Sequence, residues 1–383
     1  MSFYEVMKTD TVNYYCLFSE SGIANLKTRL SLKNLDAFKG DMEDLFAKPL
    51  ESVTEKTKPV PDIDRHDYVS LATYFWPDKD NPGGPYVSRD GFVNPEGELY
   101  DKDKLKRLAY LSYHGALLYL ITDEERYLDL VKKHLYNWFV DTEKRMNPHL
   151  EYGQFIPGVV KGRAEGIIDY GAGFTYALNM LHLLDKRGVL GTELKQGLAE
   201  WHSDFRRWLM ESNIGKAECK AGNNHGTFYE LILMAIEQFL GINDAALSHE
   251  ESLKKRIAEQ VAPDYSLPRE TARTRSVSYS FMGLKGLLEL AQMLERLGTE
   301  SSSVFYPQLR KTVDWLVDKA IEHRESWPFP QVYPFDEGSL LLFQELATGI
   351  YGPEYERIQN YVDPNKIMNP VLYYLFYREN RGK

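Results

Sequence analysis

The sequence predicts an all-α protein, an (α/α) incomplete toroid with long loops on its cleft side. From about residue 102 onward, apolar residues recur at the three- and four-residue spacing of amphipathic helices. Runs with strand-like alternation are few and short, so we expect roughly ten or more helices of about 12 to 22 residues. Two segments, residues 68–98 and 145–170, are too long and too aromatic to be simple connections. Many helices with long loops gathered at one end favour a toroid around a cleft, although periodicity leaves a plain helical bundle open.

The apolar stripes follow one another along the chain. Residues 123–142 carry apolar side chains at i, i+3, i+7 and i+10, namely Leu128, Val131, Leu135 and Trp138. Thr122 and Glu125 have the spacing of a capping box and predict the start of this helix. Comparable stripes follow in residues 192–209, 284–291 and 309–316. No linker-like segment divides the chain, so we expect one domain over residues 1–383.

Composition and charge narrow the possible functions. The 383 residues are 43% hydrophobic, which is ample for a large core, and they carry a formal net charge of −10. This acidic balance argues against a general nucleic-acid binder, although a cleft on an acidic protein can be locally basic. Cys16 and Cys219 are too few for a disulfide framework or a cysteine zinc site, and they form one disulfide or remain free thiols.

Signals for the membrane and for export are missing. No apolar run reaches 18 residues, so we expect no membrane-spanning helix. The first residues, "MSFYEVMKTD", lack the basic and apolar regions of a signal peptide. The protein is therefore intracellular, or it is periplasmic or secreted and has lost a leader.

The common catalytic signatures are also missing. The sequence has no phosphate-binding loop, no HExxH zinc helix and no nucleophile elbow, and its histidines form no pair at i, i+4. The glycines of "YGAGFTY" lie inside a helical pattern with no preceding strand, which is a weak dinucleotide signal. We therefore expect neither a metal nor an organic cofactor.

Polar side chains gather instead where two loops meet core helices. The first group, in "KAGNNHGTFYE", consists of Asn223, Asn224 and His225. The second group, in "PRETARTRSVSY", consists of Arg269, Glu270, Arg273, Arg275 and Tyr279. A helix start with free N–H groups, an amide, a histidine and arginines is suited to hold a carboxylate. A tyrosine beside such cations can transfer a proton.

Holding a carboxylate and moving a proton beside it are the requirements of β-elimination in a uronate polymer. The C5 proton of a uronate is α to the carboxylate, and donors on that carboxylate stabilise the enolate-like state that forms when the proton leaves. Each residue also has a structural interpretation. Asn224 can be a helix N-cap, His225 a core histidine and Tyr279 a core tyrosine, while Arg273 or Arg275 can pair with Glu270 at the surface. The combination favours the lyase hypothesis over these separate roles.

These residues resemble the alginate lyase superfamily of α/α-toroid polysaccharide lyases. In "NNHGTFYE" and "PRETARTRSVSY", Arg273 follows His225 by 48 residues and Tyr279 follows six residues later. Together with "YVSLATYFWPD" and "GQFIPGVVKGRAEGIIDY", this pattern is similar to polysaccharide lyase family 38, which includes glucuronan and alginate lyases, and more distantly to family 5. The resemblance covers residues 66–330.

The resemblance implies a role for each catalytic residue. Asn224 and Arg273 would bind the substrate carboxylate, and His225 would share that task or act as the base. Tyr279 would be the acid for the leaving oxygen and, in a syn elimination, also the base. One tyrosine can do both for mannuronate or glucuronate, whose C5 hydrogen and O4 share a face, whereas guluronate would need His225 as base.

The expected substrate is an anionic polysaccharide, glucuronan or alginate, cut within the chain at β-1,4 linkages; we expect no nucleic acid and no membrane as partner. Aromatic faces suit pyranose rings, and arginine, lysine and amide groups suit hydroxyls and carboxylates. The substrate-binding residues that we expect are therefore Tyr74, Phe75, Trp76, Gln154, Lys161, Arg163, Asn223 and Arg275.

Two other functions remain open at this point. A toroidal glycoside hydrolase would need two carboxylates at the scissile bond, for which Asp169, Glu230 and Glu270 are available without forming a recognisable pair. A non-catalytic uronate-binding protein would keep the aromatics and arginines without turnover. The presence of both His225 and Tyr279 disfavours it.

Overall fold

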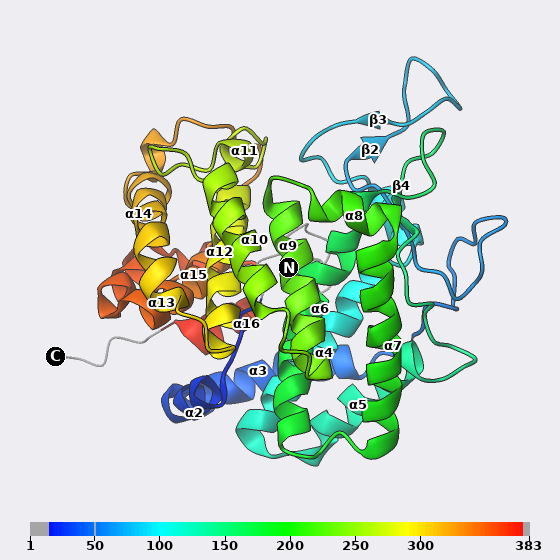
Figure 1. The fold of residues 1–383 in the computed structure, drawn as a ribbon, viewed down its shortest axis with the longest axis horizontal. Coiled ribbons are helices and arrows are strands. Elements are labelled where there is room, and N and C mark those ends of the chain that lie inside the picture. The colour runs from blue at the N-terminus through cyan, green and yellow to red at the C-terminus, as the bar shows by residue number, and fades with distance from the viewer. Residues whose placement is uncertain (1–14, 50, 378–383) are drawn as a thin grey trace.

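The computed structural model describes residues 15–49 and 51–377, and its fold is all-α as predicted (Figure 1). The prediction of one domain over residues 1–383 includes positions outside the described ranges and stays a prediction. Near the start of the described chain lie α2 (Glu20–Arg29) and α3 (Leu32–Phe46), which pack on α4; α3 also packs on α16 (Pro370–Phe376). The two ends of the described chain therefore meet on one side of the molecule.

Five long helices form an inner layer in which each helix packs against the next. They are α4 (Lys102–Thr122), α6 (Ile168–Lys186), α9 (Asn224–Leu240), α12 (Ser276–Arg296) and α15 (Gly338–Tyr351). Most of their side chains are buried, because these helices are covered on nearly every side. This explains the long apolar runs in their sequences.

Four further helices cover this layer and alternate with it along the chain. They are α5 (Glu125–Phe139) on α4, α7 (Thr192–Glu211) on α5 and α9, α10 (Ala246–Gln260) on α9 and α12, and α14 (Tyr306–Leu316) on α12 and α15. The stripe predicted for α5 is buried at all four positions, Leu128, Val131, Leu135 and Trp138. A chain that passes repeatedly from an inner to an outer helix builds the predicted (α/α) toroid.

The two long loops are brought together by short strands. β1 (Val69–Leu71) pairs in parallel with β4 (Tyr152–Phe155), and β2 (Phe75–Trp76) pairs antiparallel with β3 (Val87–Ser88). Figure 1 shows β2, β3, β4 and α8 (Asn213–Cys219) at the same end of the helices as α11 (Pro268–Thr271). Shorter helical segments complete the structure: α13 (Ser301–Val304), η1 (Pro95–Leu99), η2 (Ala164–Ile167), η3 (Val317–Glu322), η4 (Arg324–Ser326), η5 (Pro353–Tyr361) and η6 (Pro364–Lys366).

The capping box predicted for the start of α5 is wrong. Thr122 is the last residue of α4, and its hydroxyl donates to the Leu118 carbonyl at 2.7 Å. The same oxygen accepts from the backbone N–H of Glu124 at 3.2 Å, and α5 begins at Glu125 without a side-chain cap. The turn between the helices is so short that Thr122 serves the end of the first helix instead of the start of the second.

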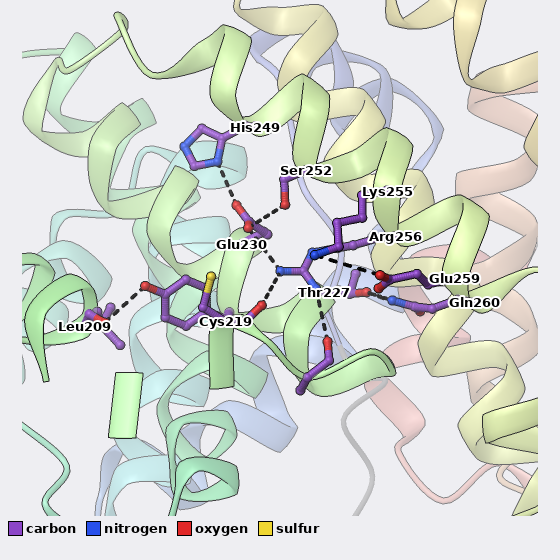
Figure 2. A network of polar contacts seen from close by, with 12 residues as sticks. Leu209, Cys219, Thr227, Glu230, His249, Ser252, Lys255, Arg256, Glu259 and Gln260 are labelled. Atoms are coloured by element: carbon purple, nitrogen blue, oxygen red, sulfur yellow. Dashed lines mark hydrogen bonds and ion pairs between the residues drawn. The ribbon is translucent and has the colours of Figure 1, made fainter. Parts of the chain in front are cut away.

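A buried ionic network joins α9 to α10 (Figure 2). His249 lies between two carboxylates. Its Nδ1 is 2.8 Å from Glu230, the contact drawn in Figure 2. Its Nε2 is 2.7 Å from Glu237. Arg256 pairs with Glu230 at 3.0 Å, and Arg206 of α7 pairs with Glu237 at 2.7 Å. Burial alone would lower the pKa of His249, but the two carboxylates outweigh it and raise this pKa to about 9.

We expect this network to make the protein lose stability as the pH becomes alkaline. A histidine whose pKa is raised in the folded state contributes stability that is fully present below its unfolded pKa of 6.5 and is lost as pH rises through about 9. The contribution is at most about 3 kcal/mol. Urea unfolding between pH 6 and 10 should show a smaller alkaline loss in His249→Gln than in the wild type. Parallel pH dependences of the two proteins would contradict this origin.

Candidate active site

A cleft of about 540 Å³ opens where the two long loops meet α8, α11 and the start of α9. It is lined by Tyr74, Phe75, Ser88, Asp90, Arg163, Ala164, Glu165, Ala217, Glu218, Ala221, Gly222, Asn223, His225, Arg269 and Arg273. Six of these are residues that the sequence predicted for the site: Tyr74, Phe75, Arg163, Asn223, His225 and Arg273. Segments far apart in the sequence therefore converge on one cavity.

The first turn of α9 places its two asparagines in different environments. Asn223 is the N-cap, and its side-chain oxygen accepts from the backbone N–H of His225 at 3.3 Å. Asn224 is fully buried, with an exposed fraction of 0%, and lies outside the cleft lining. Its backbone N–H and its Nδ2 donate to the carboxylate of Glu270 at 2.9 and 2.7 Å. The capping role considered for Asn224 thus belongs to Asn223.

His225 is oriented by a buried carboxylate. Its Nδ1 lies 2.7 Å from Oε1 of Glu218, a contact that leaves Nε2 for a ligand in the cleft. Burial alone would lower the pKa of His225, but Glu218, and at longer range Glu165 and Glu270, outweigh it and hold this pKa above its usual value. The protonated imidazole, which donates hydrogen bonds, therefore persists to higher pH than in a free histidine.

Arg273 is fixed between a carboxylate and an aromatic ring. Its Nε and Nη2 lie 3.2 and 2.7 Å from the two oxygens of Asp90, which also accepts from the backbone N–H of Thr274. Burial would raise the pKa of Asp90, but Arg273 and Thr274 outweigh it and lower this pKa. The guanidinium lies 4.0 Å from the centre of the Tyr279 ring.

Tyr279 does not belong to the cleft lining itself but contacts a residue that does. Its phenol oxygen lies 2.7 Å from that of Tyr74, which the first long loop contributes. Asp90 comes from the same loop, so this loop contacts both Arg273 and Tyr279. Gly91 has a φ of +83° and a Cβ there would overlap the Thr274 hydroxyl, so glycine permits this close approach.

Four predicted substrate-binding residues lie outside the cleft lining: Trp76, Lys161, Arg275 and Gln154. Trp76 donates from Nε1 to the Phe92 carbonyl at 2.9 Å. Lys161 lines a separate, mainly apolar groove of about 340 Å³. Arg275 is buried and forms a backbone bridge with Gln331. Their contacts with substrate stay predictions.

Gln154 supports Arg163 instead of lining the cleft. It is buried, its Nε2 donates to Asp169 at 3.0 Å, and its Oε1 accepts from Nη2 of Arg163 at 3.3 Å. The Arg163 guanidinium also lies 5.3 Å from the centre of the Phe75 ring. The second long loop thereby presents Arg163 to the cavity from a fixed position.

Several residues of the cleft could not be recognised in the sequence. Glu218 and Asp90 belong to no motif, because each contacts a partner, His225 or Arg273, that only the fold brings close to it. Arg269 stood out only as a neighbour of Glu270. It is exposed, and its guanidinium packs so closely on Gly222 that a Cβ there would overlap it. Among residues 15–49 and 51–377, no carboxylate lies within ion-pair distance of Arg269.

The carboxylates that a hydrolase would need are buried and engaged. Asp169 accepts from Tyr68, Ser70 and Gln154, while Glu230 is held in the network with His249 and Glu270 is held by Asn224. None of the three lines the cleft. Hydrolysis with two exposed carboxylates at the scissile bond therefore finds no support among them.

The described residues hold neither a metal-binding cluster nor a membrane-spanning helix. They contain no group of three or more His, Cys, Asp or Glu side chains placed to hold a metal ion. No helix in the described ranges combines the length and apolar character needed to cross a bilayer. Cys16 and Cys219 are both free thiols.

Comparison with known proteins identifies the class. The family model described as alginate lyase matches residues 52–327, which is more than half of the chain. The chain therefore belongs to the alginate lyase family and is a polysaccharide lyase, which confirms the resemblance seen in the sequence. The comparison with curated proteins found no match.

Solved structures agree over nearly the whole chain. An alginate lyase from Bacteroides ovatus is 27% identical, with a TM-score of 0.85 over 96% of this chain and 100% of that one. Alginate lyase A1-III from Sphingomonas species A1 is 15% identical, with a TM-score of 0.56 over 99% of both chains. A histidine-to-alanine variant of A1-III, complexed with a tetrasaccharide, gives 15% identity and a TM-score of 0.58 over 98% of this chain and 99% of that one. The two A1-III structures support the fold alone.

Proposed function

We propose that the protein cleaves β-1,4-linked uronate polymers, polymannuronate or glucuronan, within the chain by β-elimination. The observation that supports this most is the set of donors at one cleft, where His225 is held by Glu218 and Arg273 is held by Asp90 beside Tyr279. An alginate lyase of the same fold has been complexed with a tetrasaccharide, which adds support for a polysaccharide as the ligand. The assignment to lyase family 38 remains part of this proposal.

In this proposal, the uronate carboxylate binds between His225 and Arg273. Glu218 occupies Nδ1 of the imidazole and Asp90 occupies the Nε and Nη2 side of the guanidinium, so Nε2 and Nη1 remain for the substrate. Both donors stabilise the charge that moves onto the carboxylate as the C5 proton leaves. Asn224 would join them only if its amide turned away from Glu270.

Tyr279 then moves the proton. As a phenolate it removes the C5 proton, the C–H electron pair forms the C4=C5 double bond, and the C4–O4 bond breaks. The same proton passes from the phenol to the departing O4, so the tyrosine is regenerated. Arg273, 4.0 Å from the ring centre, and the hydroxyl of Tyr74, 2.7 Å away, offset the charge on the phenolate.

The raised pKa of His225 favours syn elimination. Nearby carboxylates keep its ring protonated to higher pH than in a free histidine, and a protonated ring cannot accept the C5 proton that an anti elimination of guluronate would deliver to it. A single tyrosine suffices where the C5 hydrogen and O4 share a face. We therefore expect mannuronate or glucuronate chains to be the substrates, ahead of guluronate chains.

The first test supplies polymannuronate, glucuronan and polyguluronate separately and follows far-UV absorbance, which reports the C4=C5 bond. We expect a rise with one of the first two polymers. Tyr279→Phe and His225→Ala should lower turnover by at least about 100-fold, whereas Tyr333→Phe, an exposed tyrosine outside the cleft lining, should not. New reducing ends without a rise in absorbance would contradict the elimination mechanism. The size of the first products decides whether the chain is cut internally.

A second test concerns the charge on His225. Glu218→Gln removes the nearest carboxylate, so the pKa of His225 should fall and the alkaline loss of kcat/KM should begin at lower pH. Glu165→Gln should move the profile in the same direction by less, because Glu165 acts at longer range. If His225 were the base, the acidic limb would move instead and activity at low pH would rise.

We also assign Arg269 to the carboxylate of a neighbouring uronate, since it is a cleft cation with no ion-pair partner among the described residues. Arg269→Gln should raise KM about tenfold with little change in kcat. Lys216→Gln removes the same charge from an exposed position on α8 outside the cleft lining and is the matched control. If both substitutions had equal effects, Arg269 would contribute only its positive charge and no specific contact with the substrate.

A further inference from the structure

The backbone that leads into α9 is held by side chains of α10. Arg256 donates from Nη2 to the Cys219 carbonyl at 3.1 Å and from Nη1 to the Ala221 carbonyl at 3.2 Å. Gln260, one helical turn further, donates from Nε2 to the Asn223 carbonyl at 3.2 Å. Three alternate carbonyls are therefore fixed immediately before the turn that carries His225.

Arg256 is itself held in place from α9. Its side chain is only 5% exposed, and Nη2 also donates to Oε1 of Glu230 at 3.0 Å. Glu230 accepts from Ser252 at 2.6 Å and contacts His249 at 2.8 Å, so its carboxylate is fully engaged. Figure 2 shows the Arg256 guanidinium between Glu230 and the Cys219 carbonyl.

The first turn of α9 is shaped to receive this guanidinium. A Cβ at Gly226 would overlap both Nη1 of Arg256 and the Ala221 carbonyl. Only glycine leaves room for the arginine to lie against the helix start. Gly226 directly follows His225, so the guanidinium packs one residue away from the proposed site.

We propose that Arg256 is a positioning residue for catalysis, which sets the place of Asn223 and His225 in the cleft through the carbonyls of Cys219 and Ala221. This inference rests on the proposed function of His225. Buried ion pairs are often replaceable by apolar groups without loss of stability, so stability alone is a weak reason for this one. Displacing a catalytic group by about 1 Å can cost about 100-fold in rate.

The test compares Arg256→Met with Arg206→Met. Arg206 belongs to the same network and pairs with Glu237 through Nε and Nη2, but within the described part of the chain it forms no hydrogen bond or ion pair with residues 219–223. Both substitutions should lower the urea midpoint. Only Arg256→Met should lower kcat, by about 10- to 100-fold, with a smaller change in KM. Added guanidinium ion should restore part of kcat in Arg256→Ala and none in Arg206→Ala.

The outcomes distinguish a failure of the positioning role from a failure of the proposed function. Equal kcat in Arg256→Met and Arg206→Met, with an active wild type, would overturn the positioning role and leave the proposed function standing. A wild type without turnover on all three uronate polymers would overturn the proposed function itself. If Arg256→Met does not fold, Gln260→Met removes the contact with the Asn223 carbonyl without leaving a buried charge unpaired. Unchanged kcat in that folded variant also counts against the proposal.

Discussion

The contact between Glu270 and Asn224 fixes the point on which the rest of the site depends. The carboxylate of α11 accepts from both the backbone and the side chain of the first residue of α9, in a fully buried position. Glu218 of α8 and Arg256 of α10 hold the same turn from two other directions. A helix start normally has several unsatisfied groups and frays, whereas this one is held on three sides. His225 is thus presented to the cleft from a turn with little freedom to move.

The two donors proposed for the catalytic carboxylate, His225 and Arg273, follow the same design, each with a carboxylate behind it. Glu218 takes one nitrogen of His225 and Asp90 takes one side of Arg273, so each donor keeps a free edge for the substrate. Both carboxylates orient their donors, and Glu218 also raises the pKa of the histidine. They also reduce the net positive field of the cleft, in a protein whose net charge is already −10. Long-range attraction of a polyanion is therefore weak. Recognition then rests on short, directed contacts more than on long-range attraction.

The sequence predicted what periodicity and local motifs can encode. The apolar stripe of α5 and the inner–outer succession of helices follow from spacing alone, and the junction motifs located the cleft. It could not predict which asparagine caps α9, because that depends on Glu270, which lies 46 residues later. Asp90 and Arg273 are 183 residues apart and carry no shared pattern. Such pairs exist only once the loops have folded onto the helices.

The placement of buried charge separates stability from function in this fold. Glu230, His249, Glu237 and Arg256 lie between two helices whose apolar faces could have packed without them. Removing four charged groups from water is costly, and their mutual attraction does little more than offset that cost. Within this network, Arg256 provides what an apolar side chain cannot, namely hydrogen bonds to the Cys219 and Ala221 carbonyls at the edge of the cleft. Under the proposed function, the physical reason to keep the network lies in where the turn that carries His225 must sit.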